Sequence, residues 1–124
     1  MKMPFVSEEL EKQLINEFAR ITGVKPTDVE VNVQDKFDRM AITLKAHAQT
    51  KDETVDTELT IERAEGERNK YNFNGRINIT GKTNQTREIA QVYSGSPQSL
   101  PYAMRKILVM AKIKKGGLLS RYFG

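Results

Sequence analysis

The chain of 124 residues contains no cysteine, no tryptophan and a single histidine. Without cysteine, a disulfide scaffold and a thiolate zinc site are both excluded. The composition gives no sign of an oxidising compartment, so we expect a cytoplasmic protein. Long apolar runs are absent as well, and Glu8 and Glu9 stand where a secretory signal would carry its apolar core. We therefore expect neither a secretory signal nor a membrane partner.

Signatures of enzymes and cofactors are missing too. The glycines are isolated or follow a predicted helix, which excludes a phosphate-binding loop and a dinucleotide fingerprint. His47 is the one histidine available to activate a nucleophile, and its place on the outward side of a strand favours an ordinary surface role. The carboxylates are spread along the chain and do not predict a metal site. The sequence thus predicts a protein that is not an enzyme and binds no cofactor or metal.

Three carboxylates, Asp56, Glu58 and Glu62, share one face of a predicted strand. An acid pair on this face is one interpretation. Opposite charges on neighbouring strands stabilise a sheet, so ion pairing across strands is the favoured one. The expected partners are the basic residues Lys45, Lys70 and Arg76.

The overall composition is typical of a globular domain. Hydrophobic residues make up 38% of the chain and charged residues 29%, proportions that favour a packed core over disorder. There is no internal repeat and no linker-like segment. We therefore expect a single α+β domain over residues 1–124, with residues 116–124 as a C-terminal tail.

Apolar residues recur at helical spacing near both ends of the chain. The first predicted helix begins after Ser7, a residue type that caps helix N-termini, and ends at Gly23. The second begins near Ser96 or Ser99, either of which can cap it, and ends at Gly116. Each helix has one apolar face, so each must pack on another element. The apolar positions are Leu10, Leu14, Phe18 and Ile21 in the first helix and Leu100, Ala103, Met104, Ile107, Leu108 and Ala111 in the second.

The middle of the chain alternates apolar and polar residues with a period of two. This pattern predicts four strands, over residues 28–33, 40–48, 55–62 and 70–79, and a weaker fifth over 87–93. The alternation indicates an antiparallel meander with one packed face and one face open to solvent or a partner. The order α-β-β-β-β-(β)-α predicts an α+β fold, a two-layer sandwich of a four- to five-stranded antiparallel meander with both helices on one face.

Charge is divided unevenly along the chain. Residues 1–81 hold 12 basic and 15 acidic side chains, a net charge of −3, whereas residues 82–124 hold 8 basic and 1 acidic, a net charge of +7. Phosphate neutralisation is the main source of nucleic-acid affinity, so this C-terminal third predicts a nucleic-acid-binding surface. A solubilising helix face, which the helix dipole also favours, is the alternative interpretation.

The predicted surface is formed by the second helix and the tail, with Lys82 and Arg87 flanking them. Two tyrosines next to cations are the predicted stacking residues. An amide-rich row on the outward face of the fourth strand, with basic residues in it, is a further candidate for contacts to bases or backbone. The candidate nucleic-acid-binding residues are Arg105, Lys106, Lys112, Lys114, Lys115, Arg121, Tyr102, Tyr122, Lys70 and Arg76.

The order of a helix, several strands and a basic final helix resembles the double-stranded RNA-binding domain. In that family the last helix begins with lysines that contact phosphates. Residues 101–106 occupy this place without the lysine cluster, and the chain has at least one strand more. The resemblance therefore extends to element order and charge and does not assign the chain to the family.

Two functions remain open at this point. The first is a small nucleic-acid-binding accessory protein, with DNA and RNA both open. The second is a protein-interaction module, such as a phage or mobile-element inhibitor of a host defence protein. In that case the basic helix meets an acidic protein surface, or a partner's strand extends an edge of the sheet. Mimicry of DNA is disfavoured by the net charge of +4.

The C-terminal tail is unusually apolar. Four of its last seven residues, Leu118, Leu119, Tyr122 and Phe123, are large and apolar. Leaving such side chains in water forfeits roughly 1.5–3 kcal/mol each relative to full burial. We expect the tail to fold back on its own monomer after Gly116 and Gly117, and a homodimer contact is the alternative.

Overall fold

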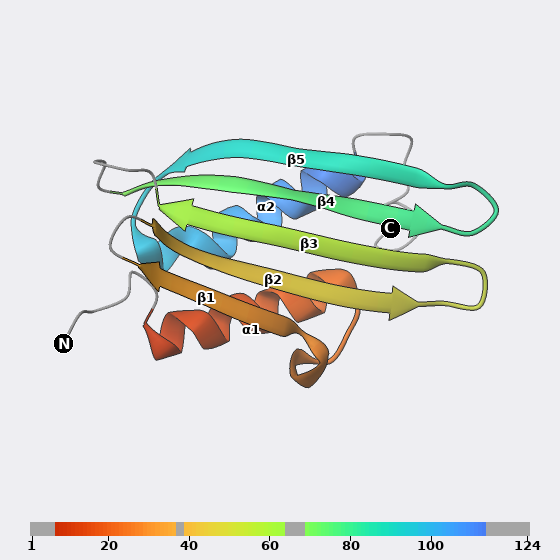
Figure 1. Cartoon of the computed structure of the whole chain (residues 1–124), viewed down its shortest axis with the longest axis horizontal. Helices are drawn as coiled ribbons and strands as arrows, with labels where there is room; N and C mark the ends of the chain where they lie inside the picture. The colour runs from red at the N-terminus through yellow and green to blue at the C-terminus, as the bar shows by residue number, and fades with distance from the viewer. Residues whose placement is uncertain (1–6, 37–38, 64–68, 114–124) are drawn as a thin grey trace.

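The computed structural model describes residues 7–36, 39–63 and 69–113 (Figure 1). Its elements follow the predicted order of one helix, five strands and one helix. They are α1 (Glu8–Thr22), the 3-10 turn η1 (Pro26–Asp28), β1 (Glu30–Lys36), β2 (Arg39–Gln49), β3 (Thr54–Arg63), β4 (Lys70–Thr80), β5 (Gln85–Ser94), the 3-10 turn η2 (Pro97–Ser99) and α2 (Leu100–Ile113). The predicted α+β architecture is confirmed.

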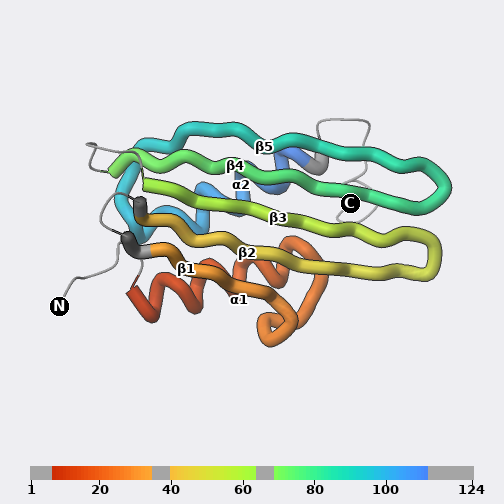
Figure 2. The backbone as a smooth tube through the Cα atoms, in the orientation of Figure 1, coloured from red at the N-terminus to blue at the C-terminus, as the bar shows by residue number. Residues whose placement is uncertain are grey.

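The five strands form one antiparallel sheet in the order β1-β2-β3-β4-β5, so each strand pairs with its neighbours in sequence. Both helices lie behind this sheet in the view of Figure 2, and they run in the same direction (Figures 1 and 2). The described residues therefore form two layers: both helices cover one face of the sheet, and no described helix lies on the other, which we call the open face.

The start and the end of α1 are those predicted. The Ser7 hydroxyl accepts a hydrogen bond from the Leu10 amide at 3.1 Å. Gly23 adopts a left-handed conformation with φ of 78°, and its amide donates to the Ala19 carbonyl. Leu14 and Phe18 are fully buried against the sheet side of the helix. The apolar stripe is thus what holds α1 on the sheet.

α2 begins directly after Ser99, one of the two serines predicted at its start. Ser96 precedes η2, but its side chain makes no capping bond. The Ser99 hydroxyl instead donates to the Ser96 carbonyl at 2.7 Å and pairs with the Tyr93 hydroxyl. Pro101 lies in the first turn, where its missing N–H is tolerated. Ser99 therefore ties the end of β5 to the beginning of α2.

The core lies between the helices and the inward face of the sheet, as the period-two pattern predicts. Fully buried side chains come from β2, β3, β4 and both helices, among them Phe18, Ile42, Leu59, Phe73 and Met104. The strand predicted as weak is in fact ten residues long and pairs with β4 from Gln85 to Ser94. Pairing along a complete neighbouring strand outweighs the polar composition of its first half.

At Gly75 of β4, the backbone of β3 leaves no room for a side chain. A Cβ atom at this position would lie 2.1 Å from the Glu58 carbonyl oxygen, far inside van der Waals contact. Glycine is thus required here by the distance between two backbones.

Candidate functional site

The candidate binding residues lie on opposite faces of the molecule. Tyr102, Arg105 and Lys106 are on the exposed side of α2, in the helical layer. Lys70 and Arg76 share the open face of the sheet with the other even-numbered residues of β4. Lys70 and Arg76 therefore do not adjoin the α2 residues, and their part in nucleic-acid binding stays a separate prediction. Lys114, Lys115, Arg121 and Tyr122 lie outside the described residues, and for Lys112 only the helical backbone is described.

The structure brings the three α2 residues together. The Tyr102 ring is 54% exposed. The Arg105 guanidinium carbon lies 5.4 Å from its centroid and the Lys106 Nζ lies 5.3 Å from it, both within cation–π range. This arrangement follows from helical spacing, because positions i+3 and i+4 lie beside position i on the helix surface. We call Tyr102, Arg105 and Lys106 the α2 cationic surface.

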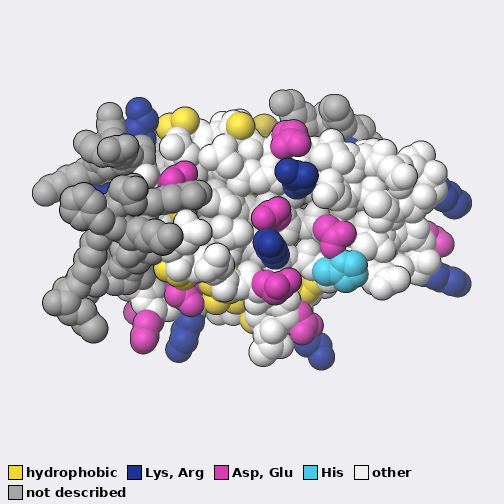
Figure 3. Space-filling view, in the orientation of Figure 1, with side chains coloured by type: hydrophobic (Ala, Val, Ile, Leu, Met, Phe, Trp, Pro, Cys, Tyr) yellow, Lys and Arg dark blue, Asp and Glu magenta, His cyan; other side chains and the backbone are white. Residues whose placement is uncertain are grey.

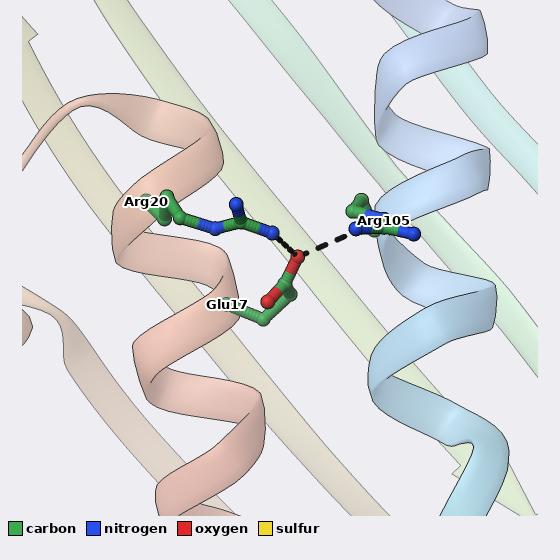
Figure 4. Close-up of polar contacts among 3 residues, drawn as sticks. All are labelled: Glu17, Arg20 and Arg105. Carbon is green, nitrogen blue, oxygen red and sulfur yellow. Dashed lines mark hydrogen bonds and ion pairs between the residues drawn. The ribbon is translucent and has the colours of Figure 1, made fainter.

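A carboxylate of α1 borders this surface (Figure 4). Glu17 Oε1 lies 3.8 Å from Arg105 Nε and forms an ion pair with Arg20 of its own helix. The Arg20 side chain is 64% exposed and that of Arg105 44%. One carboxylate is thus shared by two guanidinium groups.

Arg87, expected to flank the basic surface, has a structural role instead. It points inward from β5 and is only 5% exposed. Its guanidinium donates to the Ala111 carbonyl at 3.3 Å and to Gln85 Oε1 at 2.8 Å. A cation at the last turn of a helix is favoured by the helix dipole. Arg87 therefore anchors the C-terminal end of α2 to β5.

The open face of the sheet carries a row of alternating charge that crosses all five strands. Its members are directly opposite one another in the strand register and run Glu30, Lys45, Glu58, Arg76, Glu88. Figure 3 shows them as alternating magenta and blue side chains across the middle of the face. Lys45 Nζ lies 3.8 Å from Glu58 Oε2, so the predicted pairing of Glu58 is confirmed. Each cation in this row stands between two carboxylates. The negative charges of these neighbours weaken the attraction of the cation for a phosphate.

Other polar groups on the open face bond to one another. His47 Nδ1 is paired with Asp56 Oδ1, a partner for Asp56 that the sequence did not predict. Thr86 donates to Asn78 Oδ1 at 2.9 Å, and the hydroxyls of Thr43 and Thr60 lie 2.9 Å apart. The amide-rich row of β4 is thus partly engaged within the sheet. Across the described ranges, no three His, Cys, Asp or Glu side chains form a group that could hold a metal ion.

A groove between β5 and α2 was not predicted from the sequence. It encloses about 540 Å³ and is lined by Glu88, Ile89, Ala90, Gln91, Lys106, Ile107, Met110 and Ala111. Met110 is 66% exposed, and Val92 of β5 is 60% exposed. The uncharged run from Ile89 to Ser94 is the feature of the sequence that indicates an apolar edge here. It was not used, because this segment was predicted only weakly as a strand.

Comparison with known proteins adds no family assignment. No protein-family model, no curated protein and no solved structure matches the chain. Within the described part of the chain, neither helix is both long and apolar enough to span a membrane.

Proposed function

We propose that the protein binds nucleic acid through the α2 cationic surface. The observation that carries this proposal is the exposed Tyr102 ring with Arg105 and Lys106 beside it, on a helix face turned away from the core. Cations of this kind neutralise phosphates, and an exposed ring offers a platform for an unstacked base. In this proposal the protein works in the cytoplasm without a cofactor and without catalysis.

The cations on the two faces of the molecule differ in the number of carboxylates beside them. On the open face, Lys45 and Arg76 each stand between carboxylates of neighbouring strands. On α2, Lys106 projects from the helix beside an uncharged ring, and Arg105 shares a single carboxylate with Arg20. This contrast favours α2 over the sheet as the phosphate-binding side. The proposal extends to Lys112, Lys114, Lys115 and Arg121, which continue the basic segment in sequence.

Single-stranded nucleic acid suits this surface better than a duplex. A tyrosine ring can stack on a base only where the base is not already stacked in a helix. The test is a fluorescence anisotropy titration of labelled 20-nucleotide single strands and the matching duplex, at about 50 and 200 mM salt. We expect binding of the single strand that weakens steeply with salt. Absence of binding to either form at the lower salt contradicts the proposal.

A second function is favoured by the contact between Glu17 and Arg105. A carboxylate already lies 3.8 Å from Arg105 Nε, so an acidic side chain of a partner protein can approach the same cations. The protein would then be an adaptor or an inhibitor of a host protein. A pull-down after nuclease treatment separates the two functions, because a stoichiometric protein band that survives nuclease supports the second and argues against the first.

A further inference from the structure

The outer edge of β5 lacks the features that usually keep an edge strand from pairing with another chain. Among the described strands β5 pairs with β4 alone, and its register with that strand is continuous from Gln85 to Ser94, without a bulge. From Ile89 to Ser94 it carries neither a charged residue nor a proline. By contrast β1, at the opposite edge, has three charged residues among seven. Charges, prolines and bulges are the usual protection of an edge, so β5 is the edge left open to a partner.

Apolar side chains gather along this same edge. Ile89, Ile107 and the largely exposed Met110 line the groove beneath it, and Val92, also largely exposed, lies on the opposite face of β5. The groove offers unpaired strand backbone on one side and an apolar helix face on the other. This combination suits an extended segment with large apolar side chains.

The course of α2 brings the end of the described chain to this groove. Tyr93 at the end of β5 contacts Ser99 just before α2, and Arg87 near the start of β5 contacts Ala111 in the last turn of α2. The helix therefore runs antiparallel to β5 and ends beside the entrance of the groove. The chain continues for eleven residues after Ile113, including two glycines and then four large apolar side chains in the last seven positions.

We propose that residues 118–124, which lie outside the described part of the chain, bind in the groove between β5 and α2. At roughly 3.3 Å per residue, the seven residues span about 23 Å, against about 13 Å for the four groove-lining residues of β5. Residues 114–117 supply the length for reversal, and Gly116 and Gly117 supply the backbone freedom. Leu118, Leu119, Tyr122 and Phe123 then cover Ile107 and Met110. This inference does not depend on nucleic-acid binding.

A second copy of the chain fits the groove less well. Antiparallel pairing of two β5 edges about a two-fold axis would place the two α2 helices side by side. Lys106 is among the residues that line the groove, so the pairing would bring the Lys106 side chains of the two copies toward each other. Like charges in that position oppose association. The tail of the same chain brings one cation, Arg121, for which the groove also offers the carboxylate of Glu88.

The absence of cysteine allows a direct test by engineered cross-linking. One double variant combines Met110→Cys with Leu119→Cys, and a second double variant combines Met110→Cys with Tyr122→Cys. The matched control combines the same tail cysteines with Val109→Cys, the neighbouring position of α2, which is not among the residues that line the groove. The two pairs close loops of nearly equal length, so only the position of the tail distinguishes them. Mild oxidation at micromolar protein should give an intramolecular disulfide at least tenfold faster in a Met110 pair than in its control. Equal rates in the Met110 pair and its control overturn the proposal. Disulfide-linked dimers as the main product of the Met110 pairs also overturn it, because they show that a second copy of the chain occupies the groove.

Hydrogen exchange provides an independent readout that needs no engineered cysteine. Deletion of residues 118–124 should raise the exchange rates of amides on the free edge of β5 between Ile89 and Val92 at least tenfold. Amides of β2 and β3, in the middle of the sheet, serve as the internal control for global unfolding. Unchanged exchange in β5, with the middle strands also unchanged, contradicts the proposal.

Discussion

The Arg87 guanidinium of β5 donates a hydrogen bond to the Ala111 carbonyl in the last turn of α2, over 3.3 Å. This bond joins the outermost strand to the helix that carries the proposed binding surface. Because Arg87 is 5% exposed, its charge is compensated by polar groups of the protein in place of bulk water. The orientation of α2 on the sheet thus depends on a basic residue that is not part of the binding surface.

Replacement of Arg87 by methionine should destabilise the protein by about 2 kcal/mol, since hydrogen bonds from a charged donor to the helix end are lost. Lys82→Met removes the same charge from an exposed turn and is the matched control. Thermal unfolding followed by circular dichroism measures both. A melting temperature of the Arg87 variant equal to that of the Lys82 variant would show that the contact with Ala111 contributes nothing.

Thr57 gives a prediction of opposite sign. It is 2% exposed on the inward face of β3, and its hydroxyl has no hydrogen-bond partner among the residues that the structure describes. Thr57→Val keeps the shape and removes an unsatisfied polar group, so we expect stabilisation of about 1 kcal/mol. Thr60→Val is the control, because the Thr60 hydroxyl is paired with that of Thr43 and its loss should not stabilise. Destabilisation by Thr57→Val in chemical denaturation would refute this assignment.

Gly75→Ala should be among the most damaging single substitutions in the sheet. The new Cβ would lie 2.1 Å from the Glu58 carbonyl oxygen, so β3 and β4 would have to separate. We expect a loss of about 2–3 kcal/mol, as for overpacked sites. Gly23→Ala is the comparison, since a Cβ there meets nothing within 4 Å and only the positive φ opposes it. A smaller loss for Gly75 than for Gly23 in urea unfolding would contradict the close approach.

Tyr71 should make stability depend on alkaline pH. Burial raises the pKa of its hydroxyl above the usual value of 10.0, and the nearby Arg63 only partly opposes this shift. The unfolded chain therefore loses this proton first as the pH rises. The stabilising contribution is complete below pH 10 and is lost between 10 and the raised pKa of the folded state. Tyr71→Phe should flatten the fall in the free energy of unfolding above pH 10, and an unchanged slope would contradict the burial effect.

The regular parts of the fold were predictable because each strand must bury one face. Alternation alone assigned the inward side chains of β2, β3 and β4, and the structure confirms them. The same alternation places Arg87 on the inward side together with Ile89, so its burial could have been recognised. It was missed because a cation in a basic segment is ordinarily assigned to the surface.

The candidate site was predictable only in part. Helical spacing joins Tyr102, Arg105 and Lys106, and this cluster is present. Arg76 belongs to the other face, because the helices cover the side of β4 on which Phe73 lies. The contact of Glu17 with Arg105 and the groove beside Met110 depend on how separate elements pack, which no local pattern encodes.

The central claim is that the cations of α2, and not those of the sheet, bind phosphates. It is tested most directly by comparing two double variants of equal charge, Arg105→Gln with Lys106→Gln and Lys45→Gln with Arg76→Gln, in anisotropy titrations of a single-stranded oligonucleotide over a range of salt. The α2 variant should bind at least tenfold more weakly, and its log–log salt slope should fall by about 1.4, or roughly 0.7 for each lost phosphate contact. The sheet variant should stay within twofold of the unmodified protein. Equal losses in the two variants, or a larger loss in the sheet variant, would contradict the account.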